Sequence, residues 1–506
     1  MRTIDDIRAL SSWHDDWRGL RVAVLGLGVT GFSVADTLVE LGAAVTVFAG
    51  AADPERAELL DVIGARLVVA DLAVDGVRLV AESDAELVVV SPGFAPSHPV
   101  VSAVSTAGIP VWGDVELAWR VRDKTGTPAQ WLLVTGTNGK TTTAALTEAM
   151  LLAGGRRALA CGNIGVPVLD AVRDPIGFEV LVVELSSFQL HYAETLSPWA
   201  SVCLNIAADH LDWHGSEAAY FAAKAKVYKR TVSACVYNRD DERTRTMVEE
   251  AEVVEGCRAI GFGLGVPGPS DFGIVDDILC DRAFLDDRFT SALEIATLEQ
   301  MDAAGLGATH LVANTLAAAA LARSTGVLPE AIRTAIAGFT VDHHRTEVVA
   351  ERDGVTWVDD SKATNPHAAA ASVSAFESVV WIVGGLFKGV DVDEFVAEKR
   401  DNLAAVVVIG AHRDEVVSAF QRHAPLLPLI EVEETDTEHV MPTAVRSAAA
   451  VARHGDVVLL APAAASMDQF EDYADRGRRF TTAVHDMLGD RPDDDQHPSR
   501  QPSPRL

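Results

Sequence analysis

The sequence has little cysteine and no long apolar run. Its five cysteines are scattered through 506 residues and form no C-x-x-C pair, so neither a structural zinc site nor a disulfide framework is expected, and a reducing compartment suits them. The opening stretch MRTIDDIRALSSWHDDW carries acids in place of the apolar core of a signal peptide. No uninterrupted apolar segment reaches membrane-spanning length. We therefore expect a cytoplasmic protein that does not insert into a membrane.

Positive charge is also in short supply. Lysine and arginine number 42 against 73 aspartates and glutamates, which gives a formal net charge of −31. Such a surface repels phosphate backbones, so nucleic acid is not an expected partner. A small anionic substrate would instead have to meet local cations, helix N-termini or a metal ion.

Apolar residues make up 48% of the chain, which is enough for several packed cores. Short runs such as RVAVLGL, WLLVTG, VLVVELS and SVVWIVGG alternate with helical stretches rich in alanine and leucine. This alternation predicts an α/β fold whose parallel sheets are covered by helices on both faces. Polar seams at 120–130 and 337–349 divide the chain into three α/β domains at 1–125, 126–340 and 341–490. The tail 491–506 is expected to be disordered, and 262–300 is expected to be irregular or β, with strands that the sequence does not place.

The first domain contains a glycine-rich turn. VAVLGLGVTGFSVADTL (22–38) passes from a strand through Gly26-x-Gly28-x-x-Gly31 into a helix, the pattern of a dinucleotide-binding turn. An NAD site needs an acid at the end of the second strand, but here that strand ends in Phe48-Ala49-Gly50, and the nearest acid, Asp53, comes late. We therefore predict that the turn holds a diphosphate that is not part of a dinucleotide.

The second domain begins with a phosphate-binding loop. WLLVTGTNGKTTTAALTEAM (131–150) runs from a strand through glycines into a helix, although Val134 stands where a Walker loop has its first glycine and Gly136 makes the turn instead. Backbone N–H groups and the helix N-terminus would surround the phosphates, Lys140 would reach the terminal ones, and Thr141 would offer a hydroxyl to Mg²⁺. A tight turn with a chance lysine is the plainer alternative, and three threonines behind a buried strand argue against it.

Candidate metal ligands follow the next two strands. Glu184 ends the strand in VLVVELSSFQL, and ligands of open α/β sheets bind at the carboxyl ends of strands. NIAADHLDWHGSEAAYFAAKAKVY (205–228) then places Asp209, His210, Asp212 and His214 within six residues. His210 could bind a hard metal through its neutral imidazole, although carboxylates suit Mg²⁺ better. Taken alone, each would more often be a solvated acid or a loop histidine.

Together these stretches resemble the Mur ligase family. In the third domain, DHHRTEVV (342–349), DDSKATNP (359–366), IVGGLFKG (382–389) and LAPAAASMDQFEDYADRGRRF (460–480) resemble that family's C-terminal domain in the same order, so the resemblance covers about residues 20–485. It implies a Rossmann-like N-terminal domain, a central P-loop ATPase-like domain with a parallel sheet, and a Rossmann-like C-terminal domain. It also implies an ATP-dependent, amide-bond-forming ligase of cytoplasmic peptidoglycan precursor synthesis, which releases ADP and phosphate.

Four motifs are similar to those of the D-glutamate-adding branch of the family: SPG (91–93), GNIG (162–165), SSFQL (186–190) and AAASMDQF (463–470). This similarity implies that UDP-N-acetylmuramoyl-L-alanine and D-glutamate are the substrates and that an acyl phosphate is the intermediate. It implies that 1–125 binds the UDP-substrate, 126–340 binds ATP and 341–490 binds the amino acid. We expect only these small-molecule partners, no nucleic acid, and a monomer.

The resemblance also implies roles for single residues. Lys140, His210, Lys224 and Arg345 would be catalytic. ATP would be bound by Gly136, Thr137, Asn138, Gly139, Lys140, Thr141, Thr142, Arg345 and Asp360. The UDP-substrate would be bound by Thr30, Gly93, Asn163 and Ser186. D-Glutamate would be bound by Lys362, Thr364, Lys388, Ser466 and Tyr473, the last standing where the compared relative has phenylalanine. Two Mg²⁺ ions would be held by Thr141, Glu184, His210 and Lys224, with Lys224 carrying a carbamate.

Two other classes of protein remain as alternatives. A nucleotide-gated regulatory protein could keep the fold without catalysis, but decay would first remove such residues as Lys140, Glu184 and Lys224. An NAD(P) oxidoreductase could share the glycine turn, but the ending of the second strand argues against it. Phosphate release with ATP, Mg²⁺ and candidate substrates distinguishes all three.

Overall fold

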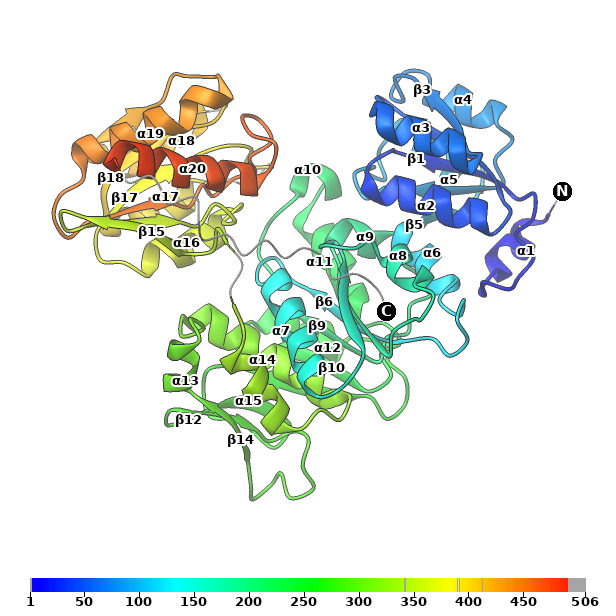
Figure 1. Cartoon of the computed structure of the whole chain (residues 1–506), viewed down its shortest axis with the longest axis horizontal. Helices are drawn as coiled ribbons and strands as arrows, with labels where there is room; N and C mark the ends of the chain where they lie inside the picture. The colour runs from blue at the N-terminus through cyan, green and yellow to red at the C-terminus, as the bar shows by residue number, and fades with distance from the viewer. Residues whose placement is uncertain (1, 341–342, 389, 391, 412, 490–506) are drawn as a thin grey trace. The chain divides into compact units, whose positions relative to one another are not determined.

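The computed structural model describes residues 2–340, 343–388, 390, 392–411 and 413–489, so the tail predicted at 491–506 lies outside the described residues. The chain separates into two compact units, Met1–Val341 and Asp342–Leu506, called here the N-terminal unit and the C-terminal unit. The described residues form three sheets, two in the N-terminal unit and one in the C-terminal unit (Figure 1). The predicted α/β fold with parallel sheets is confirmed.

The first sheet has the strand order β3-β2-β1-β4-β5, and all its neighbouring strands pair in parallel. Its strands are β1 (Arg21–Leu25), β2 (Ala44–Ala49), β3 (Arg66–Val69), β4 (Leu87–Val90) and β5 (Val111–Gly113). The helices of this region are α1 (Ile4–Ala9), α2 (Val29–Glu40), α3 (Pro54–Ile63), α4 (Gly76–Glu82), α5 (Pro99–Thr106) and α6 (Asp114–Arg120). All four residues of β4 are buried, as expected for a parallel strand covered on both faces. This is the predicted Rossmann-like sheet.

The second sheet has the order β14-β13-β12-β11-β10-β9-β6-β8-β7. Its parallel strands are β6 (Gln130–Thr135), β7 (Ala158–Gly162), β8 (Val180–Glu184), β9 (Ala200–Cys203), β10 (Ala234–Asn238), β11 (Arg258–Phe262) and β12 (Asp271–Val275). The stretch left unplaced by the sequence completes the sheet: β13 (Ile278–Asp281) and β14 (Leu293–Thr297) follow β12 in antiparallel pairs. The turn between β12 and β13 contains Asp276 at φ +55°, and a tight turn of this kind favours antiparallel pairing.

Helices surround this second sheet, and the long α14 packs against α7 beside the phosphate loop. They are α7 (Lys140–Ala153), α8 (Val168–Arg173), α9 (Ser187–His191), α10 (Leu211–His214), α11 (Glu217–Ala225), the 3₁₀ turn η1 (Lys226–Tyr228), α12 (Glu242–Glu249), α13 (Leu298–Ala303), α14 (Thr309–Ser324) and α15 (Pro329–Ala337). Small alanines along α14 are almost completely buried, which lets this helix lie close to its neighbours.

The sheet of the C-terminal unit has the order β15-β16-β20-β17-β18-β19. Among the described strands of this sheet, only the edge pair of β15 (Glu347–Arg352) and β16 (Val355–Asp359) is antiparallel. The remaining pairs are parallel and are formed by β16, β20 (Val457–Leu460), β17 (Val379–Val383), β18 (Leu403–Val408) and β19 (Leu429–Glu431). The helices are α16 (Pro366–Ser374), α17 (Asp393–Lys399), η2 (Arg400–Asn402), α18 (Arg413–His423), α19 (Thr437–Val451) and α20 (Tyr473–Leu488).

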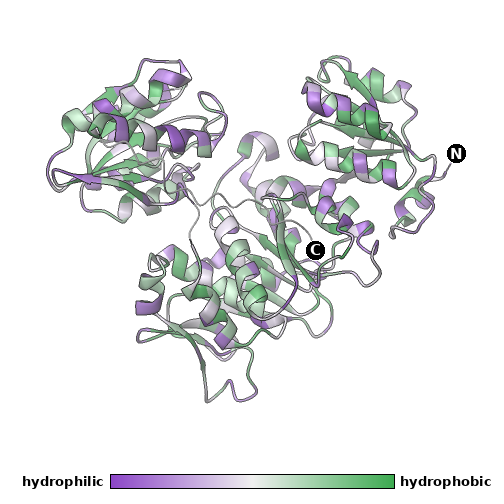
Figure 2. Ribbon diagram, in the orientation of Figure 1, coloured by the Kyte–Doolittle hydropathy of each residue, from purple (hydrophilic) through white to green (hydrophobic). Residues whose placement is uncertain are grey.

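Hydrophobic residues concentrate on the strands, and hydrophilic residues lie mainly on helices and loops (Figure 2). In the described parts of the chain, no helix combines the length and the apolar character needed to cross a bilayer.

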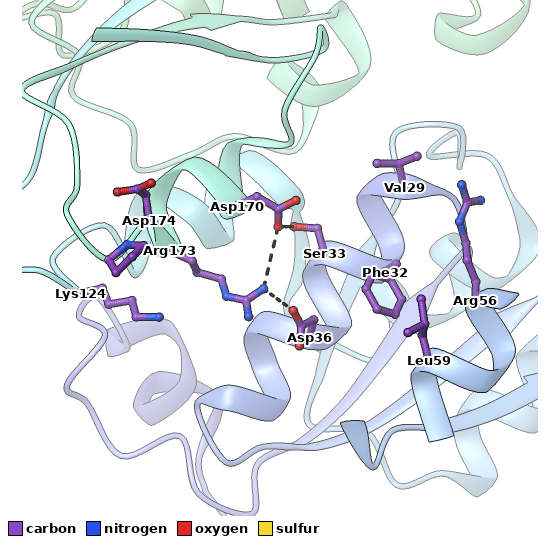
Figure 3. A pocket seen from close by; sticks show the side chains of 11 residues that line it. Val29, Phe32, Ser33, Asp36, Arg56, Leu59, Lys124, Asp170, Arg173 and Asp174 are labelled. Atoms are coloured by element: carbon purple, nitrogen blue, oxygen red, sulfur yellow. Dashed lines mark hydrogen bonds and ion pairs between the residues drawn. The ribbon is translucent and has the colours of Figure 1, made fainter. Parts of the chain in front are cut away.

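Ion pairs join the first sheet to the second within the N-terminal unit. Arg173 of α8 lies 2.5 Å from Asp36 Oδ2 of α2, and Ser33 Oγ donates to Asp170 Oδ1 at 2.5 Å (Figure 3). Arg173 also lies 2.9 Å from Glu40 Oε2 of α2. A cavity of about 590 Å³ lies here, lined by residues of α2, α3 and α8 and by Lys124. These contacts join α2 to α8, and because the charges are partly exposed each pair contributes little by itself.

Candidate active site

The phosphate loop joins β6 to α7. Gly136 and Gly139 have φ of +151° and +83°, the region that favours glycine. Gly139 is the N-cap of α7 and no side chain caps that helix, and a helix N-terminus of this kind favours an anion. Lys140 Nζ donates to the carbonyl oxygens of Gly136 and Thr137 at 3.0 and 2.9 Å, which places its charge at the loop.

Residues that follow β9 brace this loop. Asn205 Oδ1 accepts from the N–H of Asn138 at 2.9 Å, and the N–H of Ala207 donates to Thr137 Oγ1 at 2.9 Å. The hydroxyl of Tyr220 on α11 lies 2.9 Å from the same Thr137 oxygen. The loop conformation is therefore held by two neighbouring segments, the stretch after β9 and α11, as a pre-organised phosphate site requires.

Glu184 is the last residue of β8 and pairs with Val134 of β6, beside the phosphate loop. Its side chain is buried, and Oε1 accepts from Asn163 Nδ2 at 3.1 Å. The other oxygen, Oε2, is buried with no hydrogen-bond partner among the described residues. A buried carboxylate oxygen without a donor is costly, and a cation is the group that would satisfy it. The donor set at this strand end therefore fits Mg²⁺, which prefers hard oxygen ligands.

His210 lies in a constrained loop after β9. It is the N-cap of α10 and has φ of +54°, which is uncommon outside glycine and frequent at functional sites. Its N–H donates to Asp209 Oδ1 at 2.9 Å, and its ring meets the ring of Phe188 edge-on at 4.7 Å. Trp213 stacks on Phe188 at 4.5 Å. Aromatic packing from the SSFQL segment therefore supports the loop, a role that the sequence did not reveal.

The neighbouring candidates of that loop differ from His210. Asp212 is exposed, and its carboxylate accepts from the backbone N–H of the next residue, Trp213, at 2.9 Å. His214 Nε2 lies 2.9 Å from Ser187 Oγ, and burial, with help from the charges of His191 and Lys224, lowers the pKa of His214 to about 4. His214 is consequently neutral near pH 7 and packs within the loop.

Lys224 on α11 is almost fully buried. Its Nζ donates to the carbonyl of Gly136 at 2.8 Å and to Thr135 Oγ1 at 3.3 Å, so it lies under the phosphate loop. Burial, followed by the charge of Lys140, lowers the pKa of Lys224 to about 7. A substantial fraction of this side chain is therefore a neutral amine at physiological pH.

The residues expected to bind the UDP-substrate lie at the ends of strands and the starts of helices in the N-terminal unit. Thr30 is in the first turn of α2, whose N-cap, Gly28, provides no capping side chain. Gly93 follows β4, Asn163 follows β7, and Ser186 is the N-cap of α9, where its hydroxyl accepts from the N–H of Gln189. The structure brings Asn163 into contact with Glu184, as described above.

The glycine turn at Gly26–Gly31 lets the start of α2 pack closely against the end of β1. A Cβ on Gly31 would come within 2.1 Å of the carbonyl oxygen of Gly26, so only glycine lets α2 pack this tightly against β1. Asp53 follows the end of β2 at Ala49 by four residues; its carboxylate accepts from the N–H of Glu55 and caps α3. Asp53 is thereby engaged in a helix cap, in keeping with the absence of a ribose-binding acid at this strand.

The candidate residues of the C-terminal unit follow the carboxyl ends of three strands. Asp360, Lys362 and Thr364 follow β16, Lys388 follows β17, and Ser466 follows β20. Asp360 is buried; Ser372 Oγ donates to its carboxylate, and the N–H of Thr346 donates to it at 3.3 Å. Burial raises the pKa of Asp360 to about 6, against the opposing effects of Ser372 and Arg345. Tyr473 begins α20, and its ring faces Lys362.

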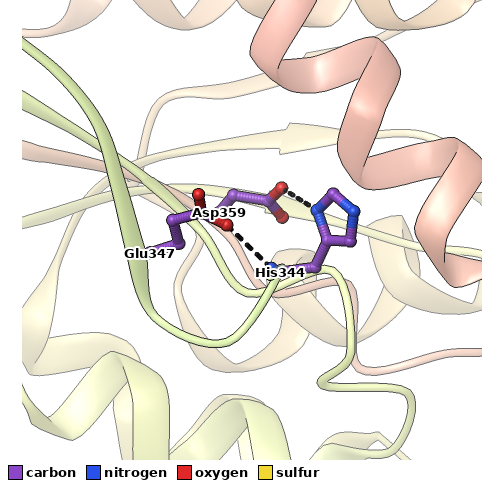
Figure 4. A group of neighbouring side chains, drawn as sticks. All are labelled: His344, Glu347 and Asp359. Carbon is purple, nitrogen blue, oxygen red and sulfur yellow. Dashed lines mark hydrogen bonds and ion pairs between the residues drawn. The ribbon is translucent and has the colours of Figure 1, made fainter. Parts of the chain in front are cut away.

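Arg345 is preceded by a histidine that the sequence did not single out. His344 Nδ1 lies 2.6 Å from Asp359 Oδ2, and its N–H donates to Glu347 Oε2 at 2.9 Å (Figure 4). Ligating atoms of these three residues lie within 4.8 Å of one another, but the groups already satisfy each other by hydrogen bonds. The hydrogen bond that the imidazole of His344 donates to Asp359 raises the pKa of His344. The trio therefore fixes the backbone next to Arg345.

Asn314 is a second residue that the sequence analysis missed. It is 6% exposed on the alanine-rich α14, and a Cβ on Gly139 would lie 2.5 Å from its Oδ1. The amide therefore touches the phosphate loop. The sequence feature that could have indicated Asn314 is its position as a lone asparagine in a helix of small apolar residues.

Known proteins match the chain along most of its length. Family models match at residues 20–113 (Mur ligase MurD-like, N-terminal domain), 134–322 (Mur ligase middle domain) and 344–464 (Mur ligase, glutamate ligase domain). A protein of Leifsonia xyli subsp. xyli, named UDP-N-acetylmuramoylalanine--D-glutamate ligase, is 64% identical over 98% of both chains. A protein of Tropheryma whipplei (strain Twist) with the same name is 48% identical over 95% of this chain and 99% of its own.

A solved structure supports the fold. The pseudomurein peptide ligase type C of Methanothermus fervidus superposes with a TM-score of 0.56 at 16% identity, covering 92% of this chain and 100% of that one. Identity this low speaks for the fold alone, whereas the two bacterial relatives align with nearly the whole chain at much higher identity. The chain belongs to the Mur ligase family.

Proposed function

We propose that this ligase joins D-glutamate to UDP-N-acetylmuramoyl-L-alanine in cytoplasmic peptidoglycan precursor synthesis, with ATP converted to ADP and phosphate through an acyl phosphate. The relatives that share 64% and 48% of its residues carry the name of this activity. The single structural observation that supports a nucleotide-dependent site is the buried Glu184 oxygen without a donor, next to a phosphate loop with an uncapped helix N-terminus.

The segment 126–340 is proposed to be the ATP-binding domain. Gly136 to Thr142 would bind the phosphates through backbone N–H groups, and Lys140 would place its ammonium on the terminal ones. Thr141 and Glu184 would hold one Mg²⁺ ion, and His210 and Lys224 a second. When bound, the metal ions supply charge neutralisation between two anionic reactants and polarise the reacting oxygens.

Lys224 suits this role only after a covalent change. A protonated lysine would repel a cation, but the neutral amine can add to CO₂, forming a carbamate and releasing one proton. The carbamate has two hard oxygens, which Mg²⁺ prefers. A pKa of about 7 and the position of Nζ under the phosphate loop support this assignment.

The segment 1–125 is proposed to bind the UDP-substrate. The N-terminus of α2 would take the diphosphate, with Thr30, Gly93, Asn163 and Ser186 as further contacts. Because β2 ends at Ala49 without an acid and Asp53 comes late and caps α3, the nicotinamide dinucleotide alternative is disfavoured.

The segment 341–490 is proposed to bind D-glutamate and part of ATP. Arg345 would reach the γ-phosphate, and Asp360 would contact the ribose. Lys362 and Lys388 would pair with the carboxylates of D-glutamate, beside Thr364, Ser466 and Tyr473. We further propose a monomer whose partners are these small molecules, without nucleic acid.

The deciding experiment measures phosphate release from the purified full-length protein with ATP and Mg²⁺. Release is expected only when UDP-N-acetylmuramoyl-L-alanine and D-glutamate are both present, and mass spectrometry should identify the joined product. L-Glutamate and diaminopimelate replace D-glutamate as controls. Equal release with either substitute, or release independent of the UDP-substrate, would contradict the proposal.

A further inference from the structure

The aromatic ring of Tyr473 faces the ammonium group of Lys362. The two residues belong to the C-terminal unit, and Lys362 Nζ lies 4.7 Å from the centre of the ring. Both side chains are partly buried. A cation over the face of an aromatic ring is attracted by the ring quadrupole, and this attraction grows when water is partly excluded.

The backbone keeps this contact in place. Ser361, the residue before Lys362, donates its hydroxyl to the carbonyl oxygen of Tyr473 at 2.7 Å. Arg476, one turn further along α20, is fully buried and donates to Ser361 Oγ at 3.0 Å and to the Ser361 carbonyl at 2.8 Å. The loop after β16 and the start of α20 are therefore tied together at the position where ring and ammonium meet.

The same arginine extends the connection to a second loop. Arg476 Nη1 donates to the carbonyl oxygen of Ala464 at 3.1 Å, two residues before Ser466. On the other side, the N–H of Lys362 donates to the carbonyl oxygen of His344 at 3.2 Å. Lys362 thus has a fixed backbone, whereas its long side chain keeps several rotatable bonds. The end of that side chain contacts the ring of Tyr473.

We propose that Tyr473 is a positioning residue that sets the affinity for the dicarboxylic amino acid by holding the Lys362 ammonium in place. The inference rests on the proposed function of the C-terminal unit. An ammonium already placed by the ring loses less conformational freedom when a carboxylate binds, so affinity rises without a new contact to the substrate. The aromatic ring carries this role, and the hydroxyl that distinguishes tyrosine from phenylalanine is not required for it.

The test is steady-state kinetics of the full-length enzyme with D-glutamate varied and ATP, Mg²⁺ and the UDP-substrate saturating. Tyr473→Leu removes the ring and is expected to raise the KM for D-glutamate by roughly 3- to 30-fold, with a smaller change in kcat. Tyr473→Phe keeps the ring and should raise this KM far less. The KM values for ATP and for the UDP-substrate serve as internal controls and should stay within about twofold.

A double-mutant cycle with Lys362→Gln decides whether the ring acts through the lysine. In the Lys362→Gln background, Tyr473→Leu should add little to the KM for D-glutamate, because the group that the ring positions is gone. An equal added effect in both backgrounds, or a Tyr473→Phe variant as impaired as Tyr473→Leu, would overturn the inference. Failure of the proposed function is distinguishable, because the unmodified enzyme would then show no D-glutamate-dependent phosphate release at all.

Discussion

Asn163 and Glu184 meet at the ends of neighbouring strands, where Asn163 Nδ2 donates to one oxygen of Glu184 at 3.1 Å. The second oxygen is buried and has no hydrogen-bond partner among the described residues. One residue proposed to bind the UDP-substrate therefore holds one proposed to bind the metal ion. Binding of the UDP-substrate and of Mg²⁺ would share this contact.

Glu184→Gln should separate the metal role from folding. We expect kcat/KM to fall by about 100-fold or more, because the neutral amide is a poor Mg²⁺ ligand. The melting temperature without Mg²⁺ should not decrease, because the substitution removes a buried charged oxygen without a donor. The matched control is Glu217→Gln, an exposed residue at the start of α11. Near-normal activity of Glu184→Gln at limiting Mg²⁺ would show that the carboxylate is not a ligand.

Lys140→Ala should abolish turnover and weaken ATP binding while the UDP-substrate still binds. The ammonium of Lys140 lies at the phosphate loop, whereas the proposed UDP-substrate contacts begin at α2 and the first sheet. Isothermal titration calorimetry with each ligand measures the two affinities. Parallel loss of both affinities would contradict the assignment of the two ligands to different segments.

Elements whose stability is local could be predicted from the sequence. The continuous apolar strands, the glycine turn at Gly26–Gly31 and the loop before α7 are each specified by neighbouring residues, and each was located correctly. The β12–β14 region could not be placed because its short strands are separated by stretches rich in glycine and aspartate, which break the apolar pattern.

Contacts between distant segments were not predictable. The support of His210 by Phe188 and Trp213, and the pairing of His344 with Asp359, depend on tertiary packing that no spacing rule encodes. Asn314 reaches Gly139 only because α14 packs on α7. The sequence therefore did not indicate which residues hold His210, Arg345 and the phosphate loop in place.

The His344–Asp359 pair should make stability depend on pH. Asp359 raises the pKa of His344 in the folded protein, so this stabilisation is complete below the unfolded histidine value of about 6.5 and is lost as pH rises through the folded pKa. Asp359→Asn should therefore lower the melting temperature by roughly 2–4 °C at pH 6 and by less at pH 9. Differential scanning calorimetry of the full-length protein gives both values.

The control for this pair is His343→Asn. His343 lies 3.0 Å from Glu347, but its side chain is 85% exposed, so its ion pair contributes little. The melting temperature of His343→Asn should stay close to that of the unmodified protein at pH 6 and at pH 9. An equal loss at pH 6 and pH 9 for Asp359→Asn would mean that the pair does not act through the charge of His344.

Lys224→Ala should lose most activity, and short carboxylates such as acetate should restore part of it by supplying oxygens near the vacated position. In the unmodified enzyme, ¹³C-bicarbonate should produce a carbamate resonance that is absent from Lys224→Ala. Because only the neutral amine adds to CO₂, the resonance should weaken as pH falls below the Lys224 pKa of about 7.

The matched control for Lys224 is the exposed Lys229→Ala, which should retain activity and the resonance. Lys226 is a less clean control, because it is partly buried and donates to the carbonyl oxygen of His191. The carbamate assignment requires that activity and the resonance be lost together in Lys224→Ala. A resonance that persists in Lys224→Ala would show that the carbamate forms on another residue. Near-normal turnover of this variant at limiting Mg²⁺ would show that the metal ion does not need the carbamate oxygens, and would contradict the metal role of Lys224.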